Sequence, residues 1–366
     1  MRTLHIGIAI VLAGIFGACR HAAEPDTRPL IFVVTKGSTD QFWLTVRAGA
    51  SDAARDKDVF LEWPSTFREN ELAGQARVLR AAIADAKKQG RRMALVLASL
   101  AGQDYREPIY AWVRSGLLLV ALDEDVRRRS VGTETSEDGG FVSFVGTDNR
   151  KAGSTAGEYL AAKLGKTGKV AMLRLNPISN STTLRERGFL DAITQYPGIQ
   201  VVDDSYYYAV NLDVESAYRE SRRLLDELGA EDIHLDGIFC PNESTTTGML
   251  LALKDRNLAG RIAYVGFDRT GLLVNALRKR EITALVVQDP YTMGKKSVER
   301  AAELLGMTGA ELQRRIMEKT FFPTYTPYVL VDHDELEKCQ AASSCDPDVL
   351  RLLYPKSTIW HLQSPG

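Results

Sequence analysis

The chain of 366 residues has little cysteine, few histidines and no excess of charge of either sign. Its four cysteines include no Cys-x-x-Cys pair and its five histidines are scattered, so a metal site has no support. Forty-six basic residues face forty-seven acidic ones, whereas nucleic-acid binders normally carry a basic excess. No internal apolar stretch is long enough to span a bilayer. The length instead suits two α/β domains of ordinary composition.

The N-terminus carries an export signal. Arg2 precedes a run from Ile6 to Phe16 that is apolar apart from glycine and too short to cross a bilayer as a mature helix. Gly17-Ala18-Cys19 resembles the lipobox of bacterial lipoproteins, although Phe16 stands where that motif usually has leucine. We expect residues 1–19 to be a signal peptide, residues 20–28 a linker, and Cys19 the lipid attachment site. The alternative is an unlipidated secreted protein, and either one is periplasmic or located in the cell envelope.

Three cysteines remain. Cys339 and Cys345 lie six positions apart in a polar tail, and an oxidising compartment would let them pair as a disulfide. Cys240 follows Gly-Ile-Phe in a buried-looking strand, so we interpret it as a small core residue.

Strand-like and helix-like segments alternate after the linker. Such alternation implies parallel sheets with right-handed crossovers. Two successive sets of five strands predict two similar doubly wound α/β domains, with the passage between them at Gly146-Thr147. From Asp334 onward the chain is polar and is predicted to be a surface extension. The expected strands are 30–35, 59–63, 93–98, 117–122 and 141–145, then 170–175, 199–202, 237–240, 262–267 and 284–287.

Four short signals follow one another where strands end or helices begin. They are Val-Gly-Thr-Asp-Asn at 145–149, Arg-Glu-Arg-Gly-Phe at 185–189, Gly-Phe-Asp at 266–268 and Val-Gln-Asp-Pro at 287–290. This edge is where open α/β sheets bind ligands. The four signals contain polar groups but no catalytic constellation, which predicts a binding protein.

The order and spacing of these signals resemble the type I periplasmic substrate-binding proteins, specifically the ribose- and galactose-binding group of sugar ABC transporters, over about residues 30 to 331. The resemblance implies two doubly wound parallel-sheet lobes joined by a three-strand hinge. We expect an N-terminal lobe of residues 29–146 plus 289–325 and a C-terminal lobe of 147–288 plus 326–333. A C-terminal extension of 334–366 would follow.

The resemblance also implies ligand-binding residues in the first lobe. Phe42 and Trp43 match the family's paired aromatics, whose ring faces suit the C–H face of a sugar, although both could simply anchor a helix in the core. Asp40 occupies a polar position beside them. Asp123 matches the aspartate after the fourth strand, where a carboxylate can accept from two adjacent hydroxyls.

Two neighbouring positions are less regular. Ser99 is the polar candidate after the third strand, where many sugar binders have asparagine, so the ligand there could differ from ribose. Glu124 belongs to a run of charge after Asp123 that we interpret as a surface loop.

In the second lobe the resemblance implies Arg185, Asn242, Asp268 and Gln288. Arg185 supplies five fixed donors and cannot lose its charge, so a closed cleft should hold a compensating carboxylate, either Asp123 or Asp268. Asp268 could cap a helix as well as bind a hydroxyl. Asn242 offers an amide that both donates and accepts, and Gln288 stands at the hinge.

The resulting hypothesis is capture of a small sugar or polyol and its delivery to an ABC-transporter permease, without cofactor or metal. The alternative keeps the fold but reports the closed form to a membrane sensor kinase or chemoreceptor. A sugar-responsive repressor would need an N-terminal helix-turn-helix where the export signal stands. An enzyme is disfavoured because there is no Gly-x-Ser-x-Gly elbow, phosphate loop or metal-spaced histidine pair. The carboxylates Asp123 and Asp268 could otherwise do acid–base work.

Overall fold

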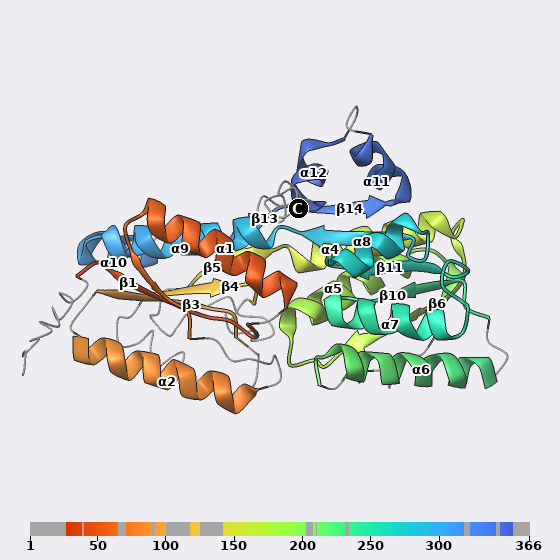
Figure 1. Ribbon diagram of the computed structural model, residues 1–366, viewed down its shortest axis with the longest axis horizontal. Helices are drawn as coiled ribbons and strands as arrows, with labels where there is room; N and C mark the ends of the chain where they lie inside the picture. The colour runs from red at the N-terminus through yellow and green to blue at the C-terminus, as the bar shows by residue number, and fades with distance from the viewer. Residues whose placement is uncertain are drawn as a thin grey trace, which may run out of the picture.

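Two six-stranded sheets form two lobes that lie side by side along the long axis of the molecule (Figure 1). The prediction of two doubly wound, parallel-sheet lobes is confirmed. Among the described residues, no helix combines the length and apolar character needed to cross a bilayer. Cys19 and the expected signal segment lie outside the described part of the chain. The computed structural model describes residues 27–38, 40–64, 71–89, 92–99, 118–124, 142–202, 208–209, 211–230, 234–317, 323–341 and 345–353.

Lobe 1 is built on an all-parallel sheet in the order β13-β5-β4-β3-β1-β2. In the first strand, Ile31 and Val33 pack under α1 and α9, while Phe32 faces α2 on the other side (Figure 1). Because both faces are covered there, the central strands β1, β3 and β4 are apolar and buried throughout rather than alternating. The strands are β1 (Leu30–Val34), β2 (Phe60–Glu62), β3 (Met93–Leu97), β4 (Leu118–Leu122), β5 (Val142–Thr147) and β13 (Thr324–Thr326); the helices are α1 (Gln41–Asp56), α2 (Leu72–Gln89), α9 (Pro290–Gly306) and α10 (Gly309–Met317).

Lobe 2 repeats the plan in the order β14-β12-β11-β10-β6-β8, with only β14 antiparallel to its neighbour. Helices α4 and α5 cover one face and α6, α7 and α8 the other. The strands are β6 (Thr167–Met172), β8 (Gly198–Val201), β10 (Gly237–Phe239), β11 (Ala263–Phe267), β12 (Ala284–Gln288) and β14 (Tyr328–Asp332), with a small pair β7 (Arg174–Leu175) and β9 (Tyr208–Ala209); the helices are α4 (Asn149–Lys163), α5 (Asn180–Ile193), α6 (Val214–Ala230), α7 (Glu243–Asp255) and α8 (Gly271–Arg278).

The chain passes between the lobes three times, from β5 to α4, from β12 to α9 and from β13 to β14. Thr147 Oγ1 donates to Gln288 Oε1 (2.7 Å), which ties the first crossing to the second. Asp148 and Asp289 each cap the helix that follows a crossing, accepting from a backbone N–H three residues ahead. The exact residue boundaries of the two lobes stay a prediction.

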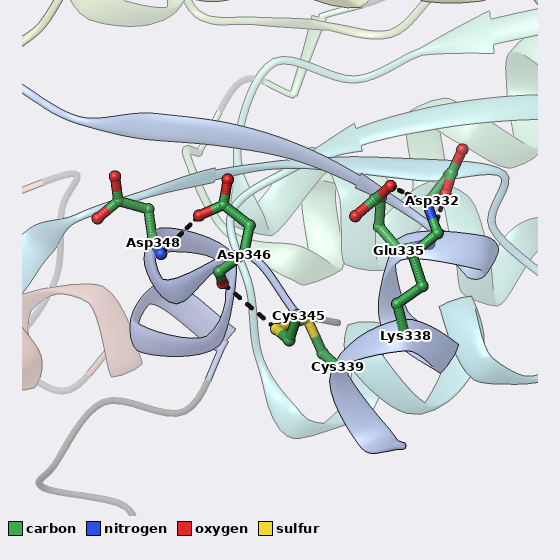
Figure 2. The surroundings of a disulfide bond; sticks show 7 residues. All are labelled: Asp332, Glu335, Lys338, Cys339, Cys345, Asp346 and Asp348. Carbon is green, nitrogen blue, oxygen red and sulfur yellow. Dashed lines mark hydrogen bonds and ion pairs between the residues drawn. A yellow bond between two sulfur atoms is a disulfide. The ribbon is translucent and has the colours of Figure 1, made fainter. Parts of the chain in front are cut away.

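The segment after β14 packs on lobe 2. It contains α11 (His333–Gln340) and α12 (Pro347–Leu353), whose buried side chains join the lobe 2 core. A disulfide joins Cys339 on α11 to Cys345, which lies just before α12 (Figure 2). Arg351 of α12 donates to Asp289 at the second crossing. The polar tail expected as a surface extension therefore contains two packed helices, held together by a disulfide and bonded to the hinge.

Candidate functional site

A cavity of about 480 Å³ lies between the lobes, at the carboxyl ends of their strands. Four helices, α1, α5, α6 and α7, begin at its wall. This is the switch-point edge where the sequence predicted a cleft. Eight of the nine predicted ligand-binding residues line it: Asp40, Phe42, Trp43, Asp123, Arg185, Asn242, Asp268 and Gln288.

Ser99 is the ninth predicted residue. It follows β3, is 3% exposed and does not line the cavity. A ligand role for Ser99 therefore stays a prediction.

Asp123 and Asp268 occupy equivalent places in the two lobes, directly after the buried strands β4 and β11. Both have left-handed backbone angles, φ 60° for Asp123 and φ 70° for Asp268, a region that aspartate enters more readily than most residues. At Asp123 the turn is tight, since Glu124 N donates to Leu122 O (2.5 Å) as in a γ-turn. Two strained turns therefore present two carboxylates to one cavity, a pattern that clusters at ligand sites.

Arg185 lies on α5 and is 3% exposed. Its Nε donates to Asn149 Oδ1 (2.8 Å), Nη1 to the carbonyl oxygen of Pro241 (3.0 Å) and Nη2 to Gln288 Oε1 (2.8 Å). The guanidinium also lies over the Phe267 ring, 4.0 Å from its centroid. Three of the five N–H groups of the Arg185 side chain thus bond to protein acceptors, and these bonds fix the plane of the guanidinium.

The close packing of α4 against α5 fixes the backbone beneath this arginine. A Cβ at Gly153 of α4 would lie 2.0 Å from the carbonyl oxygen of Arg185. Any side chain there would push α5 away and move the guanidinium, so the small residue at this contact is a requirement of the site.

The predicted compensating carboxylates both stand near Arg185. Asp123 Oδ1 lies 3.9 Å from Nη2, and Asp268 Oδ2 lies 4.0 Å from Nη1. Asp268 accepts from Gln288 Nε2 (2.5 Å) and from the backbone N–H of Glu243 (3.0 Å). Burial raises the pKa of Asp268 above its ordinary value of 3.8, although Arg185 opposes that shift.

The aromatic pair has two roles at once. Trp43 is 3% exposed and belongs to the lobe 1 core, yet it also lines the cavity. Phe42 is half-buried and meets Trp43 edge-on, with ring centroids 4.9 Å apart. Phe42 and Trp43 therefore both pack against the lobe 1 core and line the cavity.

Asn242 is the N-cap of α7 in a capping box with Thr245. Its Oδ1 accepts from Thr245 N (3.1 Å) and its Nδ2 donates to Ser244 Oγ (3.0 Å). The amide is therefore held in place by its own helix while it lines the cavity.

The sequence interpretation missed Lys36 and misjudged Glu124. Lys36 lines the cavity and is 4% exposed; its Nζ lies 2.8 Å from Asp123 Oδ2 and 2.5 Å from Glu124 Oε1. Glu124 is 1% exposed, so the interpretation as a surface charge was wrong. Lys36 pairs with both buried carboxylates, Asp123 and Glu124. The rest of that charge run, residues 125 and 127–129, lies outside the described residues. The sequence did contain a signal for this contact. Lys36 follows the first strand, and Asp123 and Glu124 follow the fourth strand of the same sheet, so the ion pair could have been predicted.

Comparison with known proteins agrees with this geometry. Residues 31–310 match the family described as "periplasmic binding protein domain". The D-ribose/D-allose-binding protein of Pseudomonas aeruginosa is 23% identical over 292 residues, covering 78% of this chain and 84% of that protein. The periplasmic component of an ABC-type sugar transport system from Hahella chejuensis is 30% identical, with a TM-score of 0.67, over 83% of this chain and 99% of that one.

A second solved structure supports the fold. A solute-binding protein of an ABC transporter from Agrobacterium vitis, bound with α-D-tagatopyranose, is 23% identical with a TM-score of 0.74. The alignment covers 90% of this chain and 100% of that one. These relatives are transport binding proteins rather than enzymes.

Proposed function

The chain belongs to the periplasmic binding protein domain family, as a type I member of the sugar ABC-transporter group, and on this premise we propose that it captures a small sugar or polyol between its lobes and delivers it to a permease. The observation that carries the proposal is that Asp123, Arg185 and Asp268, from both lobes, line one cavity.

These groups suit a ligand rich in hydroxyls. Each carboxylate oxygen can accept a hydrogen bond from a hydroxyl group, and the two N–H groups of Arg185 that are not directed at Asn149, Pro241 or Gln288 can donate to hydroxyl oxygens. The rings of Phe42 and Trp43 offer an apolar face for the C–H side of a sugar ring. Polar edges and an apolar face together are the usual lining of a small-molecule site.

Delivery requires that a partner distinguish the closed protein from the open one. A ligand that contacts both lobes binds the closed form more tightly and shifts the equilibrium towards it. A permease that recognises the closed arrangement would then receive loaded protein. Co-purification with permease subunits after crosslinking in cells tests this step; recovery of a sensor kinase or chemoreceptor in place of the permease would assign the closed form to signalling.

Family membership implies a periplasmic location. We further propose that Cys19 carries a lipid that holds the protein at the membrane. Its support is the small residues at 17 and 18 and the short apolar run before them.

A thermal-shift screen of the purified protein against monosaccharides, polyols and sugar acids tests the binding function. A compound that binds only the folded state raises the unfolding temperature, by an amount that grows with the logarithm of its concentration above the Kd. We expect at least one neutral sugar or polyol to do so in the wild type and not in an Asp123→Asn/Asp268→Asn variant. If the whole panel leaves both proteins unshifted at millimolar concentration, sugar capture is the wrong function.

A further inference from the structure

Glu124 connects lobe 1 to the N-terminus of α5 in lobe 2. Its Oε1 accepts from Ser179 Oγ (3.0 Å) and Ser181 Oγ (3.0 Å), and its Oε2 accepts from the backbone N–H of Ser181 (2.9 Å). Ser179 is the N-cap residue of α5, but its own side chain does not cap the helix. Glu124 therefore supplies, from the opposite lobe, the acceptor that the first turn of this helix needs.

Lys36 completes the same contact. Its ammonium has three N–H groups and lies near three acceptors: Asp123 Oδ2 at 2.8 Å, Glu124 Oε1 at 2.5 Å and, across the cleft, Ser181 Oγ at 3.3 Å. The same lysine thus holds Asp123, whose other oxygen faces Arg185. The side chains of Lys36, Asp123 and Glu124 are each no more than 5% exposed.

The distribution of these charges makes the contact reversible. Lys36, Asp123 and Glu124 all belong to lobe 1, so they keep one another as partners when the lobes separate. Opening breaks the bonds to the two serines and the α5 N-terminus, while Lys36 stays paired with both carboxylates. A contact of this kind favours the closed form without locking it.

We propose that Lys36 and Glu124 are positioning residues that form a latch across the cleft: they stabilise the closed form through the α5 N-terminus and hold Asp123 in its ligand-facing orientation. The effect on ligand release rests on the proposed sugar-binding function. The effect on lobe closure does not, because every contact in the latch is made by protein groups alone.

The first experiment needs no ligand. Spin labels at Lys57 and Lys163, exposed positions on opposite lobes, report the interlobe distance in the full chain. Glu124→Gln and, independently, Ser181→Ala should shift the ligand-free distance distribution towards the open form. Glu158→Gln, an exposed carboxylate on α4, is the matched charge control and should leave the distribution unchanged. An unchanged distribution in both latch variants would overturn the proposal.

A double variant separates a latch from a general loss of structure. Because Glu124 and Ser181 act on each other, Glu124→Gln/Ser181→Ala should open the protein no more than the stronger single change does. Fully additive shifts would show that the two residues act independently and would contradict the latch. Ser181→Ala keeps all charges, so it tests the contact even if Glu124→Gln folds poorly.

Stopped-flow kinetics with D-ribose as the first probe test the second half of the proposal. A latch made only in the closed form should act on release, so Glu124→Gln should raise the dissociation rate about tenfold and change the association rate less than about threefold. The latch would be contradicted if Glu124→Gln changed the association and dissociation rates by the same factor, or if it changed neither rate. If the wild type does not bind D-ribose, the spin-label distances still decide the matter, so failure of the sugar-binding proposal and failure of the latch are distinguishable.

Discussion

Arg185 Nη2 lies 3.9 Å from Asp123 Oδ1, although the two residues belong to different lobes. The separation exceeds a hydrogen bond, so each group keeps bonding capacity that faces the cavity. The arrangement shows how one ligand can be held from both sides, and it leads to the first prediction.

Arg185→Ala should lower sugar affinity by at least about 100-fold, because hydrogen bonds to charged groups contribute about 1.5–3 kcal/mol each. It should also lower the free energy of unfolding by about 2–4 kcal/mol, since the Asn149 and Pro241 oxygens lose this donor and Gln288 Oε1 keeps only Thr147. Calorimetry and urea unfolding measure the two effects. Arg187→Ala, at an exposed position on the same helix, should change neither appreciably. If Arg185→Ala binds sugar as tightly as the wild type does, Arg185 is not a ligand-binding residue.

Phe42→Ala should weaken sugar binding about tenfold, because an aromatic face contributes about 0.5–1.5 kcal/mol beyond the area it buries. Leu44→Ala is the matched control: Leu44 lies on the same helix, is 47% exposed and does not line the cavity. Titration calorimetry of the two variants should separate them. Equal affinities would mean that Phe42 only anchors α1.

The stability of the ligand-free protein should depend on Asp268. Burial raises the pKa of this carboxyl above 3.8 in the folded state, so the folded protein binds this proton more tightly than the unfolded chain does. Its contribution to stability is therefore fully present below pH 3.8 and is lost as the pH rises through the raised folded-state pKa. Sugar affinity should rise over the same window, because the ionised carboxylate can accept more hydrogen bonds from sugar hydroxyls than the protonated carboxyl can.

Asp268→Asn tests this dependence, and asparagine tolerates the left-handed backbone of the position. Urea unfolding at a series of pH values should show a flatter profile for this variant than for the wild type. Asp56→Asn, an exposed change on α1, should keep the wild-type slope. Identical slopes in all three proteins would show that Asp268 titrates alike in the folded and unfolded chains.

The disulfide between Cys339 and Cys345 should stabilise the protein by about 2 kcal/mol, the loop-closure value for a loop this short. Cys339→Ser/Cys345→Ser should therefore unfold at lower urea concentration than the oxidised wild type. A reducing agent should bring the wild type to the same midpoint and leave the variant unchanged. If the reducing agent lowered the urea midpoint of the variant as much as that of the wild type, the loss of stability would not come from this disulfide.

If Cys19 carries the proposed lipid, Cys19→Ser should release the protein from the membrane fraction when it is expressed in its native compartment, because the variant has no thiol to attach the lipid to. Fractionation and immunoblotting measure the distribution, with Cys240→Ala as the control for loss of a cysteine elsewhere. A Cys19→Ser protein that still sediments with membranes would contradict lipidation.

The sequence predicts those parts of the site that follow from strand ends. Asp123 and Asp268 each directly follow an apolar strand, which places their carboxylates at the ligand edge of a parallel sheet. Arg185 lies on a helix, and only the resemblance to a family motif indicated it. The direction of a side chain beyond a turn is harder to predict. Glu124 was misjudged because its burial depends on the γ-turn at Asp123 and on Lys36, which is distant in sequence.

Helices α11 and α12 escaped prediction for a different reason. Their buried residues, such as Leu336, Cys339 and Leu352, are few and lie among charged neighbours, so no long apolar periodicity appears. The helices depend on the lobe 2 core and on the disulfide, which are tertiary features that a local pattern does not contain.

The three crossings also have a consequence for biosynthesis. Strand β13 completes the edge of one sheet and β14 the edge of the other, while α9 packs on α1 from far along the chain. A nascent polypeptide leaving the ribosome therefore cannot finish either half until residues 324–332 have emerged. Premature termination before that point would leave both halves with an open, aggregation-prone border at the same time.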